Sequence, residues 1–354
     1  NAWFYVNWVG EELCVIATRS ILNDSLPHGS IITEINSVPT KEFFEKEYEN
    51  KVNSIFEQTK KKIYAQLFNF TGTQDKVEKI KIKCPENQEI EIIFPKTLNP
   101  SDYNWSPSRS LYFGGAHFNP SSKLLEDNIL YINFAGHMDQ KLVEYFDSIV
   151  PEINKSNGII LDLRHTWGGS NIGSEIVSYF TNEPYIYNFV DSRVNIGTRR
   201  AHGAYTDTSF VNIIGEPRNF HYKNYYRNNS FIQDTFKTKN SIPNEKKIDK
   251  PLIILINSNI ESAAEGFLIT FKQYNIGQTV GKPTGGSCSQ PLLVSLPMGG
   301  IAWIATQRTM IGQEIFFFIE PDILVENTIE KEINGIDVIF EEGLRIMKEK
   351  IDRK

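Results

Sequence analysis

The fold class follows from two stretches of the sequence: residues 158–169 read GIILDLRHTWGG, and residues 251–267 read PLIILINSNIESAAEGF. Each begins with a continuous apolar run, which is typical of a strand that is buried on both faces. Each run is followed by a helical pattern, at 173–180 and at 262–274. Buried strands that alternate with helices predict an α/β domain.

The rest of the chain extends this pattern. A strand is expected at 128–135, a helix at 140–153 and a terminal amphipathic helix at 336–350. Residues 184–248 are polar, aromatic and short-stranded, so we expect them to form an insertion between the two strand–helix units.

Residues 1–98 have a different hydrophobic pattern. Alternating apolar residues predict strands at 4–9, 13–18 and 30–35 and a hairpin of 77–83 with 89–94, around one helix from 41 to about 61. Proline- and serine-containing breaks at 99–101 and 106–108 mark a linker. We therefore expect a mainly-β domain at 1–98 and the α/β domain at 99–354.

Composition excludes several classes of protein. The chain has 354 residues, of which 40% are hydrophobic, so it can bury a sizeable core. A net charge of -6 argues against a nucleic-acid-binding protein. No apolar run reaches the roughly 18–20 residues of a membrane span. Three scattered cysteines predict neither a disulfide framework nor a metal site. The chain begins with Asn1 rather than Met, so any signal peptide is expected outside it.

Two strand–helix junctions can carry chemistry. The glycine pair Gly168-Gly169 can present main-chain N–H groups to an oxyanion, or it can simply make a tight turn. Ser262 is expected at a helix N-terminus, where it can act as a nucleophile or as an ordinary N-cap. The sequence contains no GxSxG, complete P-loop, GxGxxG or HExxH motif, so the corresponding enzyme classes are not favoured.

Four blocks in order resemble the S41 serine peptidases, the family of tail-specific (C-terminal processing) proteases and of tricorn core protease. They are GIILDLRHTWGG (158–169), INSNIESAAEGF (256–267), VGKPTGGSCSQPLLVSLPMGG (280–300), and IEPDILVENT with NGIDVIFEEGL (319–328 and 334–344). Upstream, LPHGSIITEINSVPT (26–40) resembles the core of a PDZ domain. The resemblance implies a crotonase/ClpP-like core of ββα units, preceded by a PDZ-like domain.

The resemblance also assigns roles to residues. Ser262 takes the nucleophile position, and the N–H groups of Gly168, Gly169 and Ala263 take the oxyanion hole. Asp162 and Arg164 are expected to be structural. Thr166 stands where the motif prefers an asparagine, whose expected role is to stabilise the loop.

The general base is where the sequence departs from the family. Tail-specific members carry a lysine where this chain has Ser287, and Lys282 is a poor substitute. The Thr-Gly-Gly form instead resembles the tricorn-like branch, which uses a histidine oriented by a glutamate near the closing Pro-Asp motif. Glu320 is the candidate for that glutamate, with Glu314 in reserve.

That branch carries its histidine in a segment upstream of the PDZ domain, so we expect the base to lie outside this chain. Alternatively, one of five histidines within the chain substitutes for it: His117, His137, His165, His202 or His221. His165 is the most interesting of these, because it lies in the expected oxyanion loop.

The resulting hypothesis is a serine endopeptidase that acts on peptides or on unfolded or tail segments of proteins. It needs no metal or other cofactor, and its expected partners are its substrates. The oligomeric state does not follow from the sequence. The resemblance implies an exported bacterial protein, located in the periplasm, at the cell surface or secreted outside the cell. The alternative is a catalytically inactive S41-like protein that binds peptides or other ligands.

Overall fold

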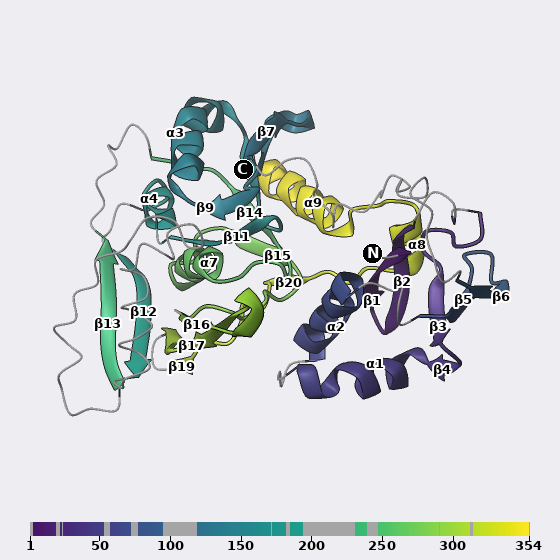
Figure 1. Ribbon diagram of the computed structural model, residues 1–354. Helices are drawn as coiled ribbons and strands as arrows, with labels where there is room; N and C mark the ends of the chain where they lie inside the picture. The colour runs from purple at the N-terminus through teal and green to yellow at the C-terminus, as the bar shows by residue number, and fades with distance from the viewer. Residues whose placement is uncertain are drawn as a thin grey trace. The chain divides into compact units, whose positions relative to one another are not determined.

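A computed structural model describes most of the chain (Figure 1). The described residues are 3–18, 22, 24–52, 57–71, 77–94, 119–170, 172–181, 185–193, 231–238, 247–289, 291–311 and 314–353. The chain divides into two compact units, one of Asn1–Ala116 with Val325–Glu342 and one of His117–Leu324 with Gly343–Lys354. The predicted boundary between residues 98 and 99 lies outside the described residues, so the assignment of 1–98 and 99–354 stays a prediction.

The first unit is built on an antiparallel sheet with the strand order β1-β2-β3-β5-β6 and with β4 paired to β3. Its strands are β1 (Phe4–Val9), β2 (Glu12–Thr18), β3 (Ile31–Ile35), β4 (Val38–Pro39), β5 (Lys79–Lys83) and β6 (Glu89–Ile93). The strands predicted from alternation at 4–9, 13–18, 30–35, 77–83 and 89–94 are confirmed to within two residues. The unit also contains the short helix α8 (Ile329–Ile333).

The single helix predicted from 41 to about 61 is wrong. The structure has α1 (Thr40–Tyr48), the 3-10 helix η2 (Glu49–Lys51) and α2 (Glu57–Thr71). The helical path ends at Val52, which is extended with φ −123° and ψ 109°. The apolar spacing was nevertheless informative, because Phe43, Phe44 and Tyr48 are all buried. Phe44 stacks on Tyr64 of α2, with the ring centroids 5.8 Å apart.

The second unit is organised around a sheet with the order β20-β15-β14-β10-β8-β7. Neighbouring strands are parallel throughout, apart from the antiparallel edge strand β7. The strands are β7 (Ser121–Leu124), β8 (Ile129–Asn133), β10 (Gly158–Asp162), β14 (Leu252–Ile256), β15 (Gln278–Gly281) and β20 (Ile323–Leu324). Both quoted apolar runs, β10 and β14, are buried along their whole length. The predicted α/β class and the mainly-β N-terminal part are confirmed.

Helices pack on both faces of this sheet. One face joins the main hydrophobic core with α3 (Gln140–Lys155), α4 (Gly173–Val177) and α7 (Ala263–Gln273), through side chains such as Leu161, Ile254, Phe146 and Phe267. The part of α9 (Val338–Asp352) from Gly343 onwards approaches the opposite face closely. A Cβ atom on Gly343 would lie 2.6 Å from Cδ2 of Leu255. The short pair β9 (Gly136–Met138) and β11 (Thr166–Gly169) is parallel.

Part of the predicted insertion is described. Strands β12 (Tyr185–Arg193) and β13 (Phe231–Thr238) form an antiparallel pair, and β12 also pairs with β18 (Gln307–Ile311). The sheet ends with β19 (Glu314–Ile315). A separate hairpin joins β16 (Pro291–Ser295) to β17 (Ile301–Ala305) through the 3-10 helix η8 (Pro297–Gly299). Another 3-10 helix, η4 (Glu126–Asn128), precedes β8.

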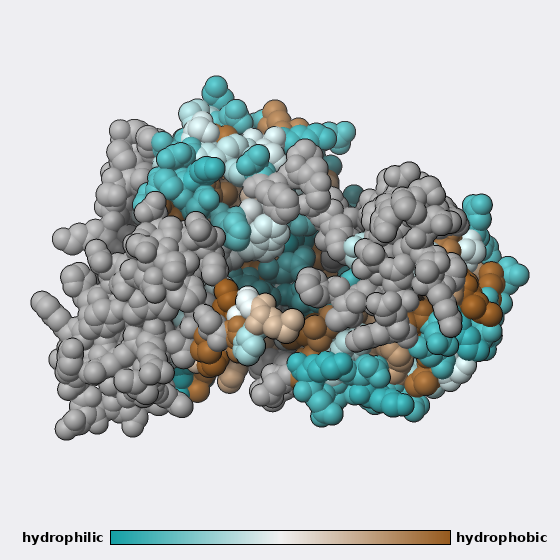
Figure 2. Space-filling view, in the orientation of Figure 1, coloured by the Kyte–Doolittle hydropathy of each residue, from teal (hydrophilic) through white to brown (hydrophobic). Residues whose placement is uncertain are grey.

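The hairpin of β16 and β17 carries exposed apolar side chains (Figure 2). They are Leu296, Met298, Trp303 and Ile304. Within the part of the chain that the structure describes, no helix combines the length and the apolar character that a membrane span requires.

Gly281 provides a test of the packing that ends β15. Its φ is +139°, and a Cβ atom there would collide with the carbonyl oxygen of Ile256. We predict that Gly281→Ala lowers the free energy of unfolding by about 3 kcal/mol, because both backbone strain and a clash with main chain are introduced. Gly266→Ala is the control, since a Cβ atom on Gly266 meets nothing within 4 Å and alanine favours the helix. Urea denaturation of both variants measures the difference, and equal midpoints would contradict the prediction.

Candidate active site

The site lies at one edge of the parallel sheet. Strands β8, β10, β14 and β15 run in the same direction, so their carboxyl ends meet at that edge. The loops that follow them carry the residues singled out from the sequence. The loop after β10 leads to Gly168 and Gly169, the loop after β14 ends at Ser262, and the loop after β15 contains Thr284 and Ser287.

Ser262 stands immediately before α7 and has an unusual backbone. Its φ is +58° and its ψ is −126°, a conformation that costs a residue other than glycine about 1–3 kcal/mol. Its side chain makes no capping hydrogen bond to the helix, although the residue occupies the N-cap position. The interpretation of Ser262 as an ordinary N-cap is therefore wrong, and its hydroxyl is not used to begin the helix.

Main-chain hydrogen bonds hold this junction on both sides of Ser262. Its carbonyl oxygen accepts from the N–H groups of Glu265 and Gly266, at 3.0 and 3.1 Å. Earlier in the loop, Ile260 N donates to the carbonyl of Asn257 at 3.2 Å, and Gly285 N donates to the carbonyl of Ile260 at 2.9 Å. The helix start and the loop after β15 thus hold the conformation from opposite sides.

Gly168 lies directly against the Ser262 side chain. A Cβ atom on Gly168 would be 2.6 Å from Cβ of Ser262, 2.9 Å from its Oγ and 3.7 Å from the nitrogen of Ala263. A Cβ atom on Gly169 would collide with the carbonyl oxygen of Met138. The structure therefore brings together Ser262, Gly168 and Ala263, with Gly169 adjacent. The role of these N–H groups as an oxyanion hole stays a prediction.

Thr166 anchors the start of the glycine loop. Its buried hydroxyl donates a hydrogen bond to the carbonyl oxygen of Phe134, the residue that follows β8. The threonine that stands in place of asparagine thus still ties the loop to the sheet.

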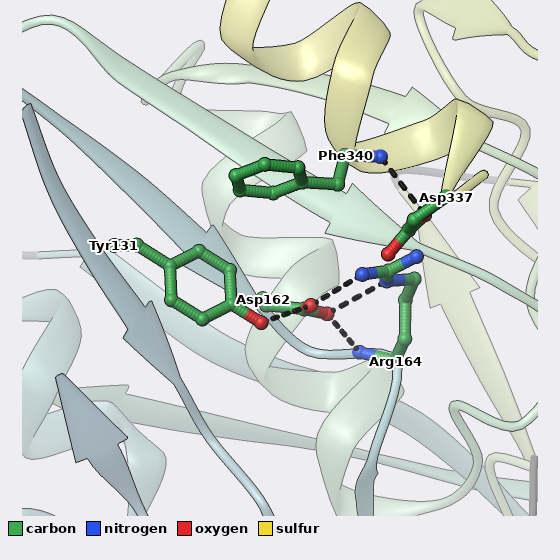
Figure 3. Close-up of polar contacts among 5 residues, drawn as sticks. All are labelled: Tyr131, Asp162, Arg164, Asp337 and Phe340. Carbon is green, nitrogen blue, oxygen red and sulfur yellow. Dashed lines mark hydrogen bonds and ion pairs between the residues drawn. The ribbon is translucent and has the colours of Figure 1, made fainter. Parts of the chain in front are cut away.

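Asp162 and Arg164 form a buried ion pair where β10 ends and this loop begins (Figure 3). Arg164 donates from Nε at 2.9 Å and from Nη2 at 2.7 Å, and Tyr131 adds its hydroxyl at 2.7 Å. Burial alone would raise the pKa of Asp162, but the charge and hydrogen bonds of Arg164 outweigh it and lower that pKa. These contacts join the end of β10 to β8 and to the start of the glycine loop.

The structure reveals a buried carboxylate that sequence reasoning did not single out. Glu265 lies in the first turn of α7 and is fully buried. Its Oε1 accepts from Thr284 Oγ1 at 2.6 Å and from Gly286 N at 2.8 Å, and its Oε2 accepts from Ser287 N at 2.9 Å. Glu265 therefore fixes the loop after β15 to the helix that begins at Ser262.

A sequence signal for Glu265 existed. It is the only charged residue in the segment 262–271, SAAEGFLITF, and an isolated charge in an apolar helix needs buried partners. Its partner Thr284 extends the network, because Thr284 Oγ1 also accepts from Ile319 N at 2.8 Å. Burial raises the pKa of Glu265 to about 7, although the three hydrogen bonds oppose this rise.

The other predicted acidic residues are not joined to Ser262. Glu320 is exposed between Ile319 and Pro321, and Glu314 is exposed at the start of β19. Their role in orienting a histidine stays a prediction. Asp322 of the Pro-Asp motif instead fixes β20 to β15, because it accepts hydrogen bonds from Thr279 N and Oγ1, both at 2.8 Å. Ser287, at the expected lysine position, is exposed.

Two of the candidate histidines are described near the glycine loop. His165 is half-buried, and its carbonyl oxygen accepts from Gly136 N at 3.0 Å. His137 is exposed on β9, and its Nδ1 lies 3.2 Å from the carbonyl oxygen of Gly168. His117, His202 and His221 lie outside the described residues.

Comparison with known proteins decides the family. The sequence model of peptidase family S41 matches residues 128–325, which is more than half of the chain. The chain belongs to peptidase family S41. Membership supports a serine peptidase activity and peptide or protein substrates.

Two solved structures with TM-scores above 0.5 show the same fold. Mature CPAF in complex with lactacystin is 13% identical, with a TM-score of 0.67 over 100% of this chain and 84% of that one. Mature CPAF alone is 13% identical, with a TM-score of 0.65 over 98% of this chain and 81% of that one. A candidate peptidase from Parabacteroides merdae ATCC 43184 is 20% identical, with a TM-score of 0.47, and the match covers 64% of each chain, which is under two thirds of that protein.

The buried carboxylate predicts a pH dependence of stability. Because folding raises the pKa of Glu265 from 4.5 to about 7, the folded state binds the extra proton between these pH values. The free energy of unfolding should therefore fall by about 3 kcal/mol as the pH rises from 4.5 to 7, at 1.36 kcal/mol per pH unit. Glu265→Gln does not titrate and should lack this component.

Denaturant titrations at several pH values check the Glu265 prediction. Glu144→Gln, an exposed change on α3, controls for the loss of one negative charge. The prediction is contradicted when the wild-type protein and Glu265→Gln show the same change of unfolding free energy over this pH range.

Proposed function

We propose that the protein is a serine endopeptidase that hydrolyses peptide bonds in peptides or in unfolded or tail segments of proteins, with Ser262 as its nucleophile. The observation that carries the proposal is the Ser262 junction. A serine is held at φ +58° without a capping bond, and a Cβ atom on Gly168 would lie only 2.9 Å from its Oγ. Strained backbone of this kind is concentrated at functional sites.

The proposed reaction uses the groups around this hydroxyl. Oγ of Ser262 attacks the scissile carbonyl carbon while a base takes its proton, and the carbonyl electron pair moves to the oxygen. Main-chain N–H groups of the Gly168–Gly169 loop and of Ala263 stabilise that oxyanion. The proton then passes to the leaving amine, and water releases the acyl group from Ser262.

We propose a histidine as the base, oriented by Glu320 and supplied by a segment outside this chain. The loop after β15 supports an external base, because its residue at the family's lysine position is Ser287, which has no basic group. The exported location implied by the resemblance likewise stays a prediction.

The proposed substrates suit the surface that follows this loop. The hairpin of β16 and β17 begins two residues after Ser289, and it exposes Trp303 and Ile304 by 54% and 51%. Exposed apolar groups of this kind occur at protein interaction sites. Unfolded segments present apolar side chains that folded proteins bury.

A catalytically inactive binding protein is the second candidate. It is favoured by one observation: the loop after β15 carries Ser287, which has no basic group, at the family's lysine position. Such a protein would bind peptides at the same loops without forming an acyl-enzyme.

Labelling with a fluorophosphonate probe tests the proposed function in the full-length protein. We predict that the probe modifies Ser262, and that Ser262→Ala abolishes labelling and lowers kcat for peptide cleavage by at least about 10³-fold. Ser148→Ala, an exposed change on α3, is the matched control and should behave like the wild-type protein. Full peptidase activity of Ser262→Ala would sink the proposal. A wild-type protein that binds peptide but resists the probe would support the binding alternative.

A further inference from the structure

We infer that His137 is a positioning residue for the oxyanion hole: its imidazole holds the carbonyl group of Gly168 and thereby fixes the direction of the next N–H group, that of Gly169. The inference rests on the proposed function. It adds a residue that lies outside the quoted motif blocks, on the strand that pairs with the glycine loop.

The first observation is the contact itself. Nδ1 of His137 lies 3.2 Å from the carbonyl oxygen of Gly168. A carbonyl oxygen can only accept a hydrogen bond, so Nδ1 carries the proton and donates. The bond reaches the glycine that packs directly against Ser262.

The second observation concerns the ring. His137 is exposed, so burial does not fix the orientation of its imidazole. Trp167 does so instead, because the two rings meet edge to face with their centroids 5.4 Å apart and an angle of 64° between their planes. His137 and Trp167 are also register partners in the parallel pair of β9 and β11. Trp167, the cross-strand neighbour of His137, thus orients Nδ1 toward the carbonyl oxygen of Gly168.

The consequence follows from the geometry of the peptide bond. The carbonyl group of Gly168 and the N–H group of Gly169 belong to one planar trans peptide unit and point in opposite directions. Holding the oxygen on one side therefore sets where the N–H group points on the other. Two successive glycines have more backbone freedom than any other pair, so this peptide unit needs an external restraint.

Strand β9 supplies restraint on both sides of this unit. Ser170 N donates to the carbonyl oxygen of Met138 at 2.8 Å, which holds the end of the loop. Gly169 packs so closely on the same carbonyl that it has no room for a side chain. His137 holds the Gly168 carbonyl in between. An exposed hydrogen bond adds only about 1 kcal/mol to stability, so its main effect falls on the orientation of the loop.

Three substitutions in the full-length protein test the inference. His137→Ala removes ring and donor, His137→Phe keeps a ring on Trp167 without the donor, and His137→Asn places an amide N–H where Nδ1 stands. With a peptide substrate, we expect kcat to fall by about 10- to 100-fold for the alanine and phenylalanine variants, with KM changed by less than about twofold. The asparagine variant should recover kcat to within about threefold of wild type.

A second readout separates orientation from folding. A peptide boronate forms a tetrahedral adduct with a nucleophilic serine, so its inhibition constant should rise in parallel with the loss of kcat. Thermal unfolding of all three variants should stay close to that of the wild-type protein. A large loss of unfolding temperature that accounts for the loss of kcat would overturn the inference.

Three further results would contradict a positioning role of His137. Unchanged kcat in His137→Ala and His137→Phe would overturn the inference while leaving the role of Ser262 intact. A loss beyond about 10³-fold that asparagine does not rescue would show that His137 itself accepts the proton of Ser262, which also contradicts a positioning role. A wild-type protein that neither cleaves peptides nor reacts with a fluorophosphonate would fail the proposed function, and the inference with it.

Discussion

The backbone of Ser262, held at φ +58° between a buried strand and a buried helix, is the constraint on which the site depends. The chain turns sharply at this residue, and the serine hydroxyl does not cap α7. It is unfavourable for a residue with a side chain, and it persists because the surrounding hydrogen bonds determine it. The N–H groups of Glu265 and Gly266 fix the carbonyl of Ser262, and the loop after β15 fixes Ile260.

The parallel sheet converts this local feature into a site. Since the carboxyl ends of β10, β14 and β15 share one edge, three loops distant in sequence meet near the start of α7. Two buried carboxylates then stabilise these loops in different ways. Asp162 is ionised against Arg164, whereas Glu265 accepts three hydrogen bonds and has no cationic partner among the described residues. The second arrangement links the stability of the site to pH.

Much of this organisation could be predicted from the sequence, because continuous apolar runs and helical spacing are local signals. The strands β10 and β14 and the helix α7 followed from them, whereas the proximity of Ser262 to the glycine loop was implied by the resemblance to the S41 peptidases. The side-chain contacts that orient the loops of the site could not be predicted in this way. The bond from His137 to Gly168 joins two strands through a carbonyl group, and no residue pattern encodes it. The break at Val52 was hidden because apolar spacing continued through a change of backbone direction.

One measurement tests the central claim most directly: a crystal structure of the full-length protein after reaction with a peptide boronate. The account predicts a covalent bond from boron to Oγ of Ser262. It also predicts one boronate oxygen within hydrogen-bond distance of Ala263 N and of an N–H group in the Gly168–Gly169 loop. A bond to another residue would contradict the account. So would an adduct at Ser262 whose oxygens all point away from both N–H groups.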